Sequence, residues 1–471
     1  MAVSKSRKKS KKPAKTGASR SGNPALRAAA AQEAAAVPAQ RHEPFVDGLF
    51  GGFSEQRRRL DAQRERRAGR EAAVVIESLL QLTTSPRATE DALCLRMGEL
   101  LSHERPLERS QRPDDVDPLQ RYGPEHLLPV LTNALVGRAA ASAEAPRQER
   151  ESLHRLLVAA ARISATPVPD GLVLAIGRLA RSLDAAVGPH TPDALKCEPQ
   201  GAALWCRDGY GTRFAITAPF TDPDGGPDRW YLWDVDACTT DAFTVGSGYF
   251  PDPATALTAW RDGAGQEATH ADEFTPVTDR FLAARLLPSP PDFLHPGGED
   301  EHQFAEFHRC RRLAAELRNS PHIGKATSTP PPAGLDAWAE EFAAWRAEHR
   351  GGRSAIPDGH PITEEDQPPS ERELYEDLAR SWHIDGFPEL AYACSPHRLS
   401  YAAASIRDYY TDPYSSLIVG LLPDVAAWLT GRAALPAHLA ERSHATAAAL
   451  AGARGADLAP DEDSMLARVA E

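Results

Sequence analysis

Apolar positions over residues 74–187 recur at the spacing of amphipathic helices. In the clearest example, Leu172, Ile176 and Leu179 stand four and three positions apart, and the stripe continues to Val187. Such spacing gathers apolar side chains on one face of an α-helix. Asp170, just before the stripe, has the residue type of an N-cap. Residues 56–190 are therefore predicted to form a helical domain.

The pattern changes near residue 195 from helical spacing to the alternation of β-strands. Residues 213–218 alternate in polarity, and residues 229–235 are rich in aromatics. Further along, Asp252 and Pro253 have the types expected at an N-cap and the first helical position. We therefore predict a small antiparallel β-meander with a closing helix over residues 195–268.

Helical periodicity returns over residues 270–460, interrupted by Pro-rich linkers at 320–334 and 350–369. Ser370 with Glu373 predicts a capping box at the start of one helix. Later helices are expected over residues 398–410, 414–430 and 436–452. The predicted fold class is α+β and predominantly α-helical, with a helical region, the β-meander and a helical C-terminal region following a disordered basic tail.

The tail is defined by charge. The chain has 471 residues and a formal net charge of −13, yet the first 20 residues contain eight cations and no acid, which leaves −21 on the rest. The cations are Lys5, Arg7, Lys8, Lys9, Lys11, Lys12, Lys15 and Arg20. Residues 1–55 carry little apolar surface and are predicted to be a disordered Lys-rich tail. Such a segment can bind DNA or RNA non-specifically by releasing counterions; the alternative is a terminus that only promotes solubility.

The motifs that are missing from the sequence exclude several classes of protein. The sequence contains neither a phosphate-binding loop nor a dinucleotide-binding glycine motif, and its six cysteines form no Cys-x-x-Cys pair. We therefore predict no cofactor and no metal site. An apolar segment long enough for a secretory signal or a membrane span is also missing, so the expected location is cytoplasmic, without a membrane partner. The Ala- and Arg-rich composition indicates a bacterial genome of high GC content.

Two groups of residues could carry chemistry. Asp234 and Asp236 bracket Val235, and strand alternation would place both carboxylates on one side, where they could hold a cation. Ser395 and His397, with the neighbouring Cys394, join a possible nucleophile to a histidine. Each group also has an ordinary structural explanation. Asp234 and Asp236 fit a solvent-exposed strand end, and Ser395 and His397 fit a turn whose polar groups are hydrogen-bonded locally.

Two weaker patterns are better explained by packing. His302, Glu306 and Cys310 follow one another at four-residue steps, but no further metal ligands accompany them. Tyr231 and Trp233 belong to an aromatic strand that could stack on single-stranded bases. Few cations surround that strand, so core packing is the preferred interpretation.

Three functional hypotheses follow. The favoured one is a non-catalytic interaction protein whose basic tail binds nucleic acid. An alternative is an enzyme whose site is assembled only by the fold, with Asp234, Asp236 and His397 as candidates. The third is an adapter or scaffold that docks protein partners. Whether the chain is an enzyme is left open by the sequence.

Overall fold

The computed structural model describes most of the chain from residue 62 onward. The described ranges are 62–63, 66–102, 124–164, 167–183, 195, 197–239, 242–265, 269, 273–288, 301–323, 334–351, 356, 369–384 and 390–452. Contacts divide the chain into a unit formed mainly by residues 72–471 and a second unit of residues 9–71. Everything below concerns the larger unit.

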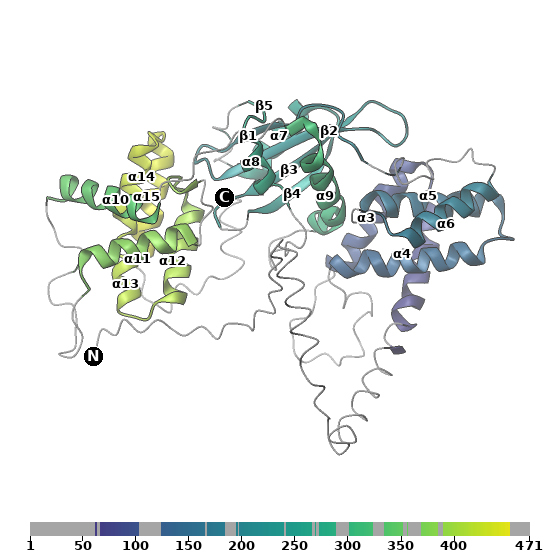
Figure 1. Ribbon diagram of the computed structural model, residues 1–471, viewed down its shortest axis with the longest axis horizontal. Helices are drawn as coiled ribbons and strands as arrows, with labels where there is room; N and C mark the ends of the chain where they lie inside the picture. The colour runs from purple at the N-terminus through teal and green to yellow at the C-terminus, as the bar shows by residue number, and fades with distance from the viewer. Residues whose placement is uncertain are drawn as a thin grey trace, which may run out of the picture. The chain divides into compact units, whose positions relative to one another are not determined.

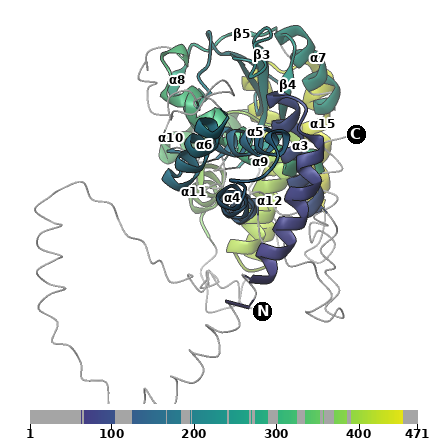
Figure 2. The ribbon, with the colours of Figure 1, turned by 90° about the vertical axis from the view of Figure 1, so that its right-hand side faces the viewer.

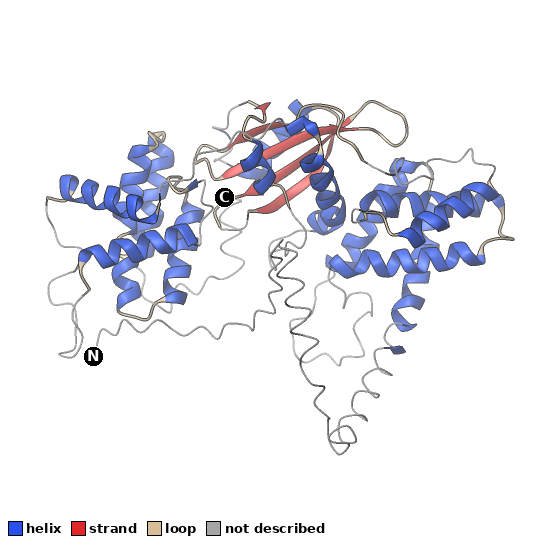
Figure 3. Cartoon of the chain, viewed as in Figure 1, coloured by secondary structure: helices blue, strands red, loops and turns tan. Residues whose placement is uncertain are grey.

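The fold is α+β and predominantly helical, which confirms the predicted class (Figures 1 and 3). Residues 66–82 are helical, and the helices that follow before the sheet are α3 (Pro86–Ser102), α4 (Pro124–Ala141), α5 (Arg147–Ile163) and α6 (Asp170–Ser182). Those that accompany the sheet are α7 (Pro253–Ala264), α8 (Arg280–Leu286) and α9 (Glu301–Asn319). The C-terminal helices are α10 (Leu335–His349), α11 (Glu371–Ile384), α12 (Pro396–Tyr409), α13 (Tyr414–Val419), α14 (Leu422–Arg432) and α15 (Ala437–Gly452).

One antiparallel sheet lies between the two helical regions in sequence. Its spatial order is β4-β3-β2-β1-β5. The strands are β1 (Leu204–Arg207), β2 (Arg213–Phe220), β3 (Arg229–Asp236), β4 (Phe243–Phe250) and β5 (Thr275–Pro276). The first four form a meander, in which each strand pairs with its neighbour in sequence. The two-residue β5 adds to β1 from beyond the range expected for the meander.

Both faces of the sheet are covered by helices, which explains why every residue of β2 is buried. Trp233 and other odd-numbered residues of β3 pack in a core with α8 and α9, where the Trp233 indole donates to the Cys310 carbonyl oxygen. Leu232 faces the opposite way and packs with Trp260 of α7. The alternation in sequence therefore separates two apolar faces instead of an apolar face and a solvated one.

The helices of the C-terminal region enclose a second core, rich in tryptophan. Trp338 of α10, Trp382 of α11 and Trp428 of α14 belong to it. The indole N–H groups of Trp338 and Trp382 both donate to the carbonyl oxygen of Ala391, which precedes α12. These bonds hold the segment that leads into α12, and α12 carries one half of the site described below.

Local signals for helix starts are mostly confirmed. Asp252 caps α7 by accepting from the Thr255 amide, and Ser370 and Glu373 form the expected capping box before α11. The assignment of Asp170 as an N-cap is wrong. Pro169 is the capping residue of α6, and its carbonyl oxygen accepts the first helical bonds, so Asp170 is the first residue inside the helix.

Two segment predictions also need correction. The helix expected over residues 414–430 is divided into α13 and α14, because the second helix starts anew around Pro423, which has no N–H to continue the first. In the expected linker at 320–334, Pro321–Ile323 forms a short 3₁₀ turn with Ile323 buried in the sheet core. The basic tail lies outside the described residues. Within the described part of the chain, no helix combines the length and apolar character needed to cross a bilayer.

Candidate functional site

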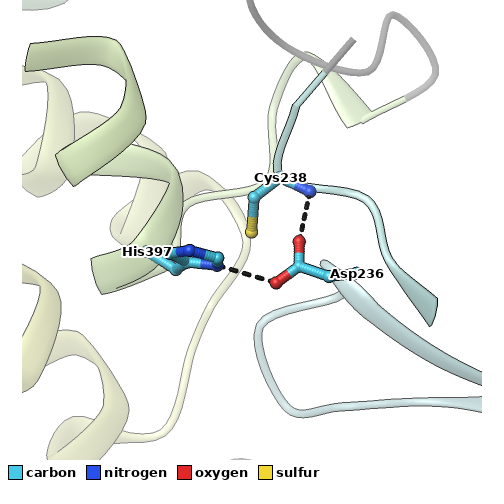
Figure 4. Close-up of side chains that lie close together, drawn as sticks. All are labelled: Asp236, Cys238 and His397. Carbon is cyan, nitrogen blue, oxygen red and sulfur yellow. Dashed lines mark hydrogen bonds and ion pairs between the residues drawn. The ribbon is translucent and has the colours of Figure 1, made fainter. Parts of the chain in front are cut away.

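The cluster of interest joins the end of β3 to the start of α12. Asp236, Cys238 and His397 each offer an atom that can bind a metal, and these atoms all lie within 4.8 Å of one another. Figure 4 shows the Cys238 thiol and the Asp236 carboxylate directed toward the imidazole of His397. Among the described residues, no other group of three such side chains converges in this way.

Asp236 and Cys238 are positioned by the turn that ends β3. Arg213 of β2 pairs with Asp236 in the sheet register, and the Ala237 amide donates to the Thr212 carbonyl oxygen beyond the strand. The Cys238 amide then donates to Asp236 Oδ1 at 2.7 Å. Because this bond closes a side-chain turn, it fixes the Asp236 carboxylate while leaving its second oxygen available.

His397 is positioned by the capping of α12. Ser395 is the N-cap and accepts from the Arg398 amide, and Pro396 occupies the first turn. The Ser395 hydroxyl oxygen also lies 3.4 Å from Cys238 Sγ, so the cap contacts the thiol directly. The imidazole of His397 packs against the Tyr401 ring, one turn further along the helix.

The imidazole and the carboxylate form a buried hydrogen-bonded ion pair. His397 Nδ1 lies 2.7 Å from Asp236 Oδ2, and their side chains are 11% and 5% exposed. Burial lowers the pKa of His397, but the Asp236 carboxylate more than offsets it and holds that pKa well above its ordinary value. Burial acts upward on the pKa of Asp236, and the charge of His397 outweighs it, so the net shift is downward. The pair is therefore imidazolium and carboxylate near neutral pH.

Two further properties describe what the cluster can do. Burial raises the pKa of the Cys238 thiol, and the Asp236 charge acts in the same direction, so the free thiol is protonated near neutral pH. His397 Nε2 is buried and has no hydrogen-bond partner. A protonated, buried thiol is a poor nucleophile, whereas a metal ion would stabilise the thiolate outright.

A third carboxylate, Asp208, lies near the cluster in the turn between β1 and β2. Its Oδ1 accepts from the amides of Thr212 and Arg213. Burial raises the pKa of Asp208 to about 7, with the Asp236 charge adding to the effect and the two amide donors opposing it. Asp208 is thus partly protonated near neutral pH and limits the negative charge gathered around Asp236.

The structure brings some of the candidate residues from the sequence together and separates others. Asp236 and His397 meet in the cluster, whereas Asp234 does not: it is held by Arg213 through two hydrogen bonds and by the Trp260 indole. The Cys394 thiol is buried and is not one of the converging side chains. The third member of the cluster, Cys238, was not among the residues singled out in the sequence. Its only signal there is its position two residues after Asp236.

The remaining candidates serve packing. Glu306 accepts from the Tyr231 hydroxyl and from Arg309, and Cys310 is buried in the sheet core, while the side chain of His302 lies outside those described. Tyr231 and Trp233 are fully buried and cannot stack on nucleic-acid bases. Comparisons with known protein families, with curated proteins and with solved structures find no match to this chain.

Proposed function

We propose that the protein binds a divalent transition metal ion of the zinc type through Asp236, Cys238 and His397. The observation that carries the proposal is the convergence of three different ligand types on one buried point. Thiolate, imidazole and carboxylate are the side chains that bind zinc in proteins. Three protein ligands leave one position of a tetrahedral ion open, which is the composition of catalytic zinc sites and not of structural ones.

Charge balance supports a divalent ion. Without metal, the carboxylate and the imidazolium cancel and the Cys238 thiol is neutral, so the cluster carries no net charge. With a dication bound, the thiolate and the carboxylate together supply two negative charges, and the imidazole is neutral. The cluster is neutral in both states, so the ion enters without leaving an uncompensated charge in a buried site.

The geometry needs only a small adjustment for this. Ligands bound about 2.0–2.3 Å from a tetrahedral zinc lie roughly 3.3–3.8 Å from one another. The 2.7 Å contact between His397 Nδ1 and Asp236 Oδ2 is shorter, so the two groups would separate by less than about 1 Å if both were ligands. In a second arrangement, Asp236 keeps its bond to Nδ1–H and only orients the ring, and the ion is then held by two protein ligands, the Cys238 thiolate and the unpartnered His397 Nε2.

The decisive experiment is metal loading of the full chain. Protein stripped with a chelator is reloaded with Zn²⁺ or Co²⁺ and assayed for bound ion and for thiolate-to-cobalt absorption. We expect one ion per chain. Replacing a ligand in Cys238→Ala should weaken binding by more than about a hundredfold, exceeding the 10–100-fold effect of losing an outer partner.

Cys394→Ala is the matched control, because Cys394 is a buried thiol in the segment leading into α12 but is not one of the converging ligands. It should bind as the wild type does. A wild-type protein that retains no ion above the level of non-specific surface binding would rule the metal site out, whether or not the variants fold.

A second function, nucleic-acid binding by the tail, is supported by charge alone. The eight cations within residues 1–20 belong to a chain whose remainder carries −21. About six phosphate contacts would lower affinity on the order of a thousandfold between roughly 50 and 200 mM salt. Removing residues 1–20 should abolish the binding of DNA and RNA and its salt dependence. Equal affinity of the truncated and full-length chains would exclude this role.

A further inference from the structure

Ser395 lies between the cluster and the start of α12. Its hydroxyl oxygen accepts from the Arg398 amide at 3.2 Å, which makes Ser395 the N-cap of the helix. The same oxygen lies 3.4 Å from Cys238 Sγ. Ser395 and Cys238 are 3% and 2% exposed, so both contacts are shielded from solvent. One buried hydroxyl group therefore joins the helix cap to the thiol of the cluster.

The two contacts of this hydroxyl differ in direction. An amide N–H can only donate, so the Ser395 oxygen is the acceptor in its bond with Arg398. The hydroxyl hydrogen is left to be donated, and Cys238 Sγ is its only acceptor among the described residues. A buried donor without an acceptor would cost free energy. The Ser395 hydroxyl is therefore directed at the sulfur.

Cys197 shows a different arrangement for a buried cysteine. Its thiol lies 3.7 Å from the Arg162 carbonyl oxygen, which can only accept, so the sulfur is the donor there. At Cys238 the sulfur is the acceptor instead. A neutral thiol accepts hydrogen bonds weakly, whereas the charge of a thiolate makes it a much better acceptor. The donor at Ser395 consequently suits the thiolate form of Cys238, which a bound metal stabilises.

We propose, on the basis of the metal site above, that Ser395 is a positioning residue whose hydroxyl donates a hydrogen bond to the metal-bound Cys238 thiolate. The bond withdraws charge from the sulfur and ties this ligand to the helix that carries His397. The N-terminus of α12, a helix of 14 residues, acts in the same direction because its partial positive charge also favours a thiolate.

The test uses the full chain loaded with Co²⁺, since thiolate-to-cobalt absorption responds to the charge on the sulfur. Ser395→Ala removes the hydroxyl with little change in volume, and Ser395→Gly replaces it with a residue that still caps helices well. Without the hydrogen bond the sulfur lone pairs rise in energy, so both variants should shift the absorption to longer wavelength by the same amount. Cobalt affinity should fall roughly tenfold, as for loss of an outer partner.

Two further variants separate the hydrogen bond from the helix cap. Ser395→Thr keeps a hydroxyl and should restore the wild-type absorption. Asp252→Ala removes the N-cap of another helix, α7, and should lower the melting temperature without moving the absorption. If Ser395 acted only as a cap, Ser395→Ala would likewise lower the melting temperature and leave the spectrum of bound cobalt unchanged.

A measurement on the wild type does not depend on the folding of any variant. In protein loaded with ¹¹³Cd²⁺, the Ser395 hydroxyl proton should show nuclear magnetic coupling to the metal through the sulfur, alongside the ring protons of His397. Ring-proton coupling without a coupled hydroxyl proton would overturn the proposal.

The cobalt spectra distinguish this proposal from the metal site on which it rests. A wild type with thiolate-to-cobalt absorption that stays unshifted in Ser395→Ala and Ser395→Gly would overturn the role of Ser395 and leave the metal site standing. A wild type that shows no such absorption would overturn both.

Discussion

At Asp208, two physical effects act in opposite directions on one carboxyl group. The amides of Thr212 and Arg213 stabilise the charged form, and burial disfavours it. Burial has the larger effect and brings the pKa to about 7, from a usual value of 3.8. The folded state therefore binds a proton on Asp208 over a pH range where the unfolded chain has already released it.

This raised pKa predicts a stability change with pH. Because the folded pKa of Asp208 exceeds the unfolded value, its contribution is fully present below about pH 4 and is lost as pH rises to about 7. At about 1.4 kcal/mol per pKa unit, the loss is on the order of 4 kcal/mol. In Asp208→Asn, whose amide oxygen can still accept both bonds, urea unfolding of metal-free protein should lack this slope.

The exposed Asp252 supplies the control for that experiment, because its pKa is lowered by its capping bonds to Thr255 instead of raised. Above about pH 4, Asp252→Asn should show the same pH slope as the wild type. If Asp208→Asn and the wild type lose stability in parallel between pH 4 and 7, Asp208 ionises normally and burial does not govern it.

The two possible roles of Asp236 can be separated by a single substitution. If its carboxylate binds the metal, Asp236→Asn should weaken zinc affinity by more than about a hundredfold. If it only orients His397, the amide oxygen can still accept from Nδ1–H but without the carboxylate's charge, and the loss should be roughly 10–100-fold. Competition with a calibrated chelator measures the affinity. An unchanged affinity would exclude both roles.

At the level of elements, buried ion pairs connect helices that are distant in sequence. Glu90 of α3 accepts from Arg309 of α9 and from Arg162 of α5, both at 3.0 Å. Burial acts to raise the pKa of Glu90, but the two guanidinium groups outweigh it and the net shift is downward. Figure 2 shows α3, α5 and α9 close together in a second view. Glu90 is thus the charged link among three helices.

Neutralising this link should destabilise the fold. Glu90→Gln leaves Arg162 without its carboxylate, and removing one partner of a buried pair typically costs about 3–5 kcal/mol. Glu99→Gln on the same helix removes a half-exposed ion pair with Arg96 and should cost less than about 1 kcal/mol. Urea unfolding measures both. Equal and small effects would mean that Glu90 contributes no more than a surface charge does.

For the whole molecule, the proposed metal centre connects the sheet to the C-terminal helices. An ion that binds only the folded chain stabilises it by about 4 kcal/mol at a free concentration a thousandfold above its dissociation constant. Zinc should therefore raise the midpoint of urea unfolding, and a chelator should reverse the change. The effect should vanish in Cys238→Ala. Equal stabilisation of that variant would mean that the ion binds elsewhere.

Features decided by residues that are neighbours in the sequence can be predicted from the sequence. Features that depend on contacts between distant residues cannot. The cap at Asp252 and the capping box at Ser370 are recognisable because neighbouring residues decide them. At Asp170 the residue type alone predicts a cap that the structure places one position earlier, since the Pro169 carbonyl oxygen accepts the first helical bonds. The partnership of Asp236 with His397 joins residues 161 positions apart, and it depends on strand register and on the docking of α12. No local pattern contains that information.

That separation has a consequence for how the chain is made. During synthesis Asp236 leaves the ribosome 161 residues before His397, an interval on the order of 10 s at ordinary elongation rates. Throughout that time the β-meander can fold, but its last turn presents a carboxylate without a counter-charge and a thiol without its cap. Nascent chains stalled before residue 395 should accordingly react with alkylating reagents at Cys238, and chains stalled well beyond α15 should not.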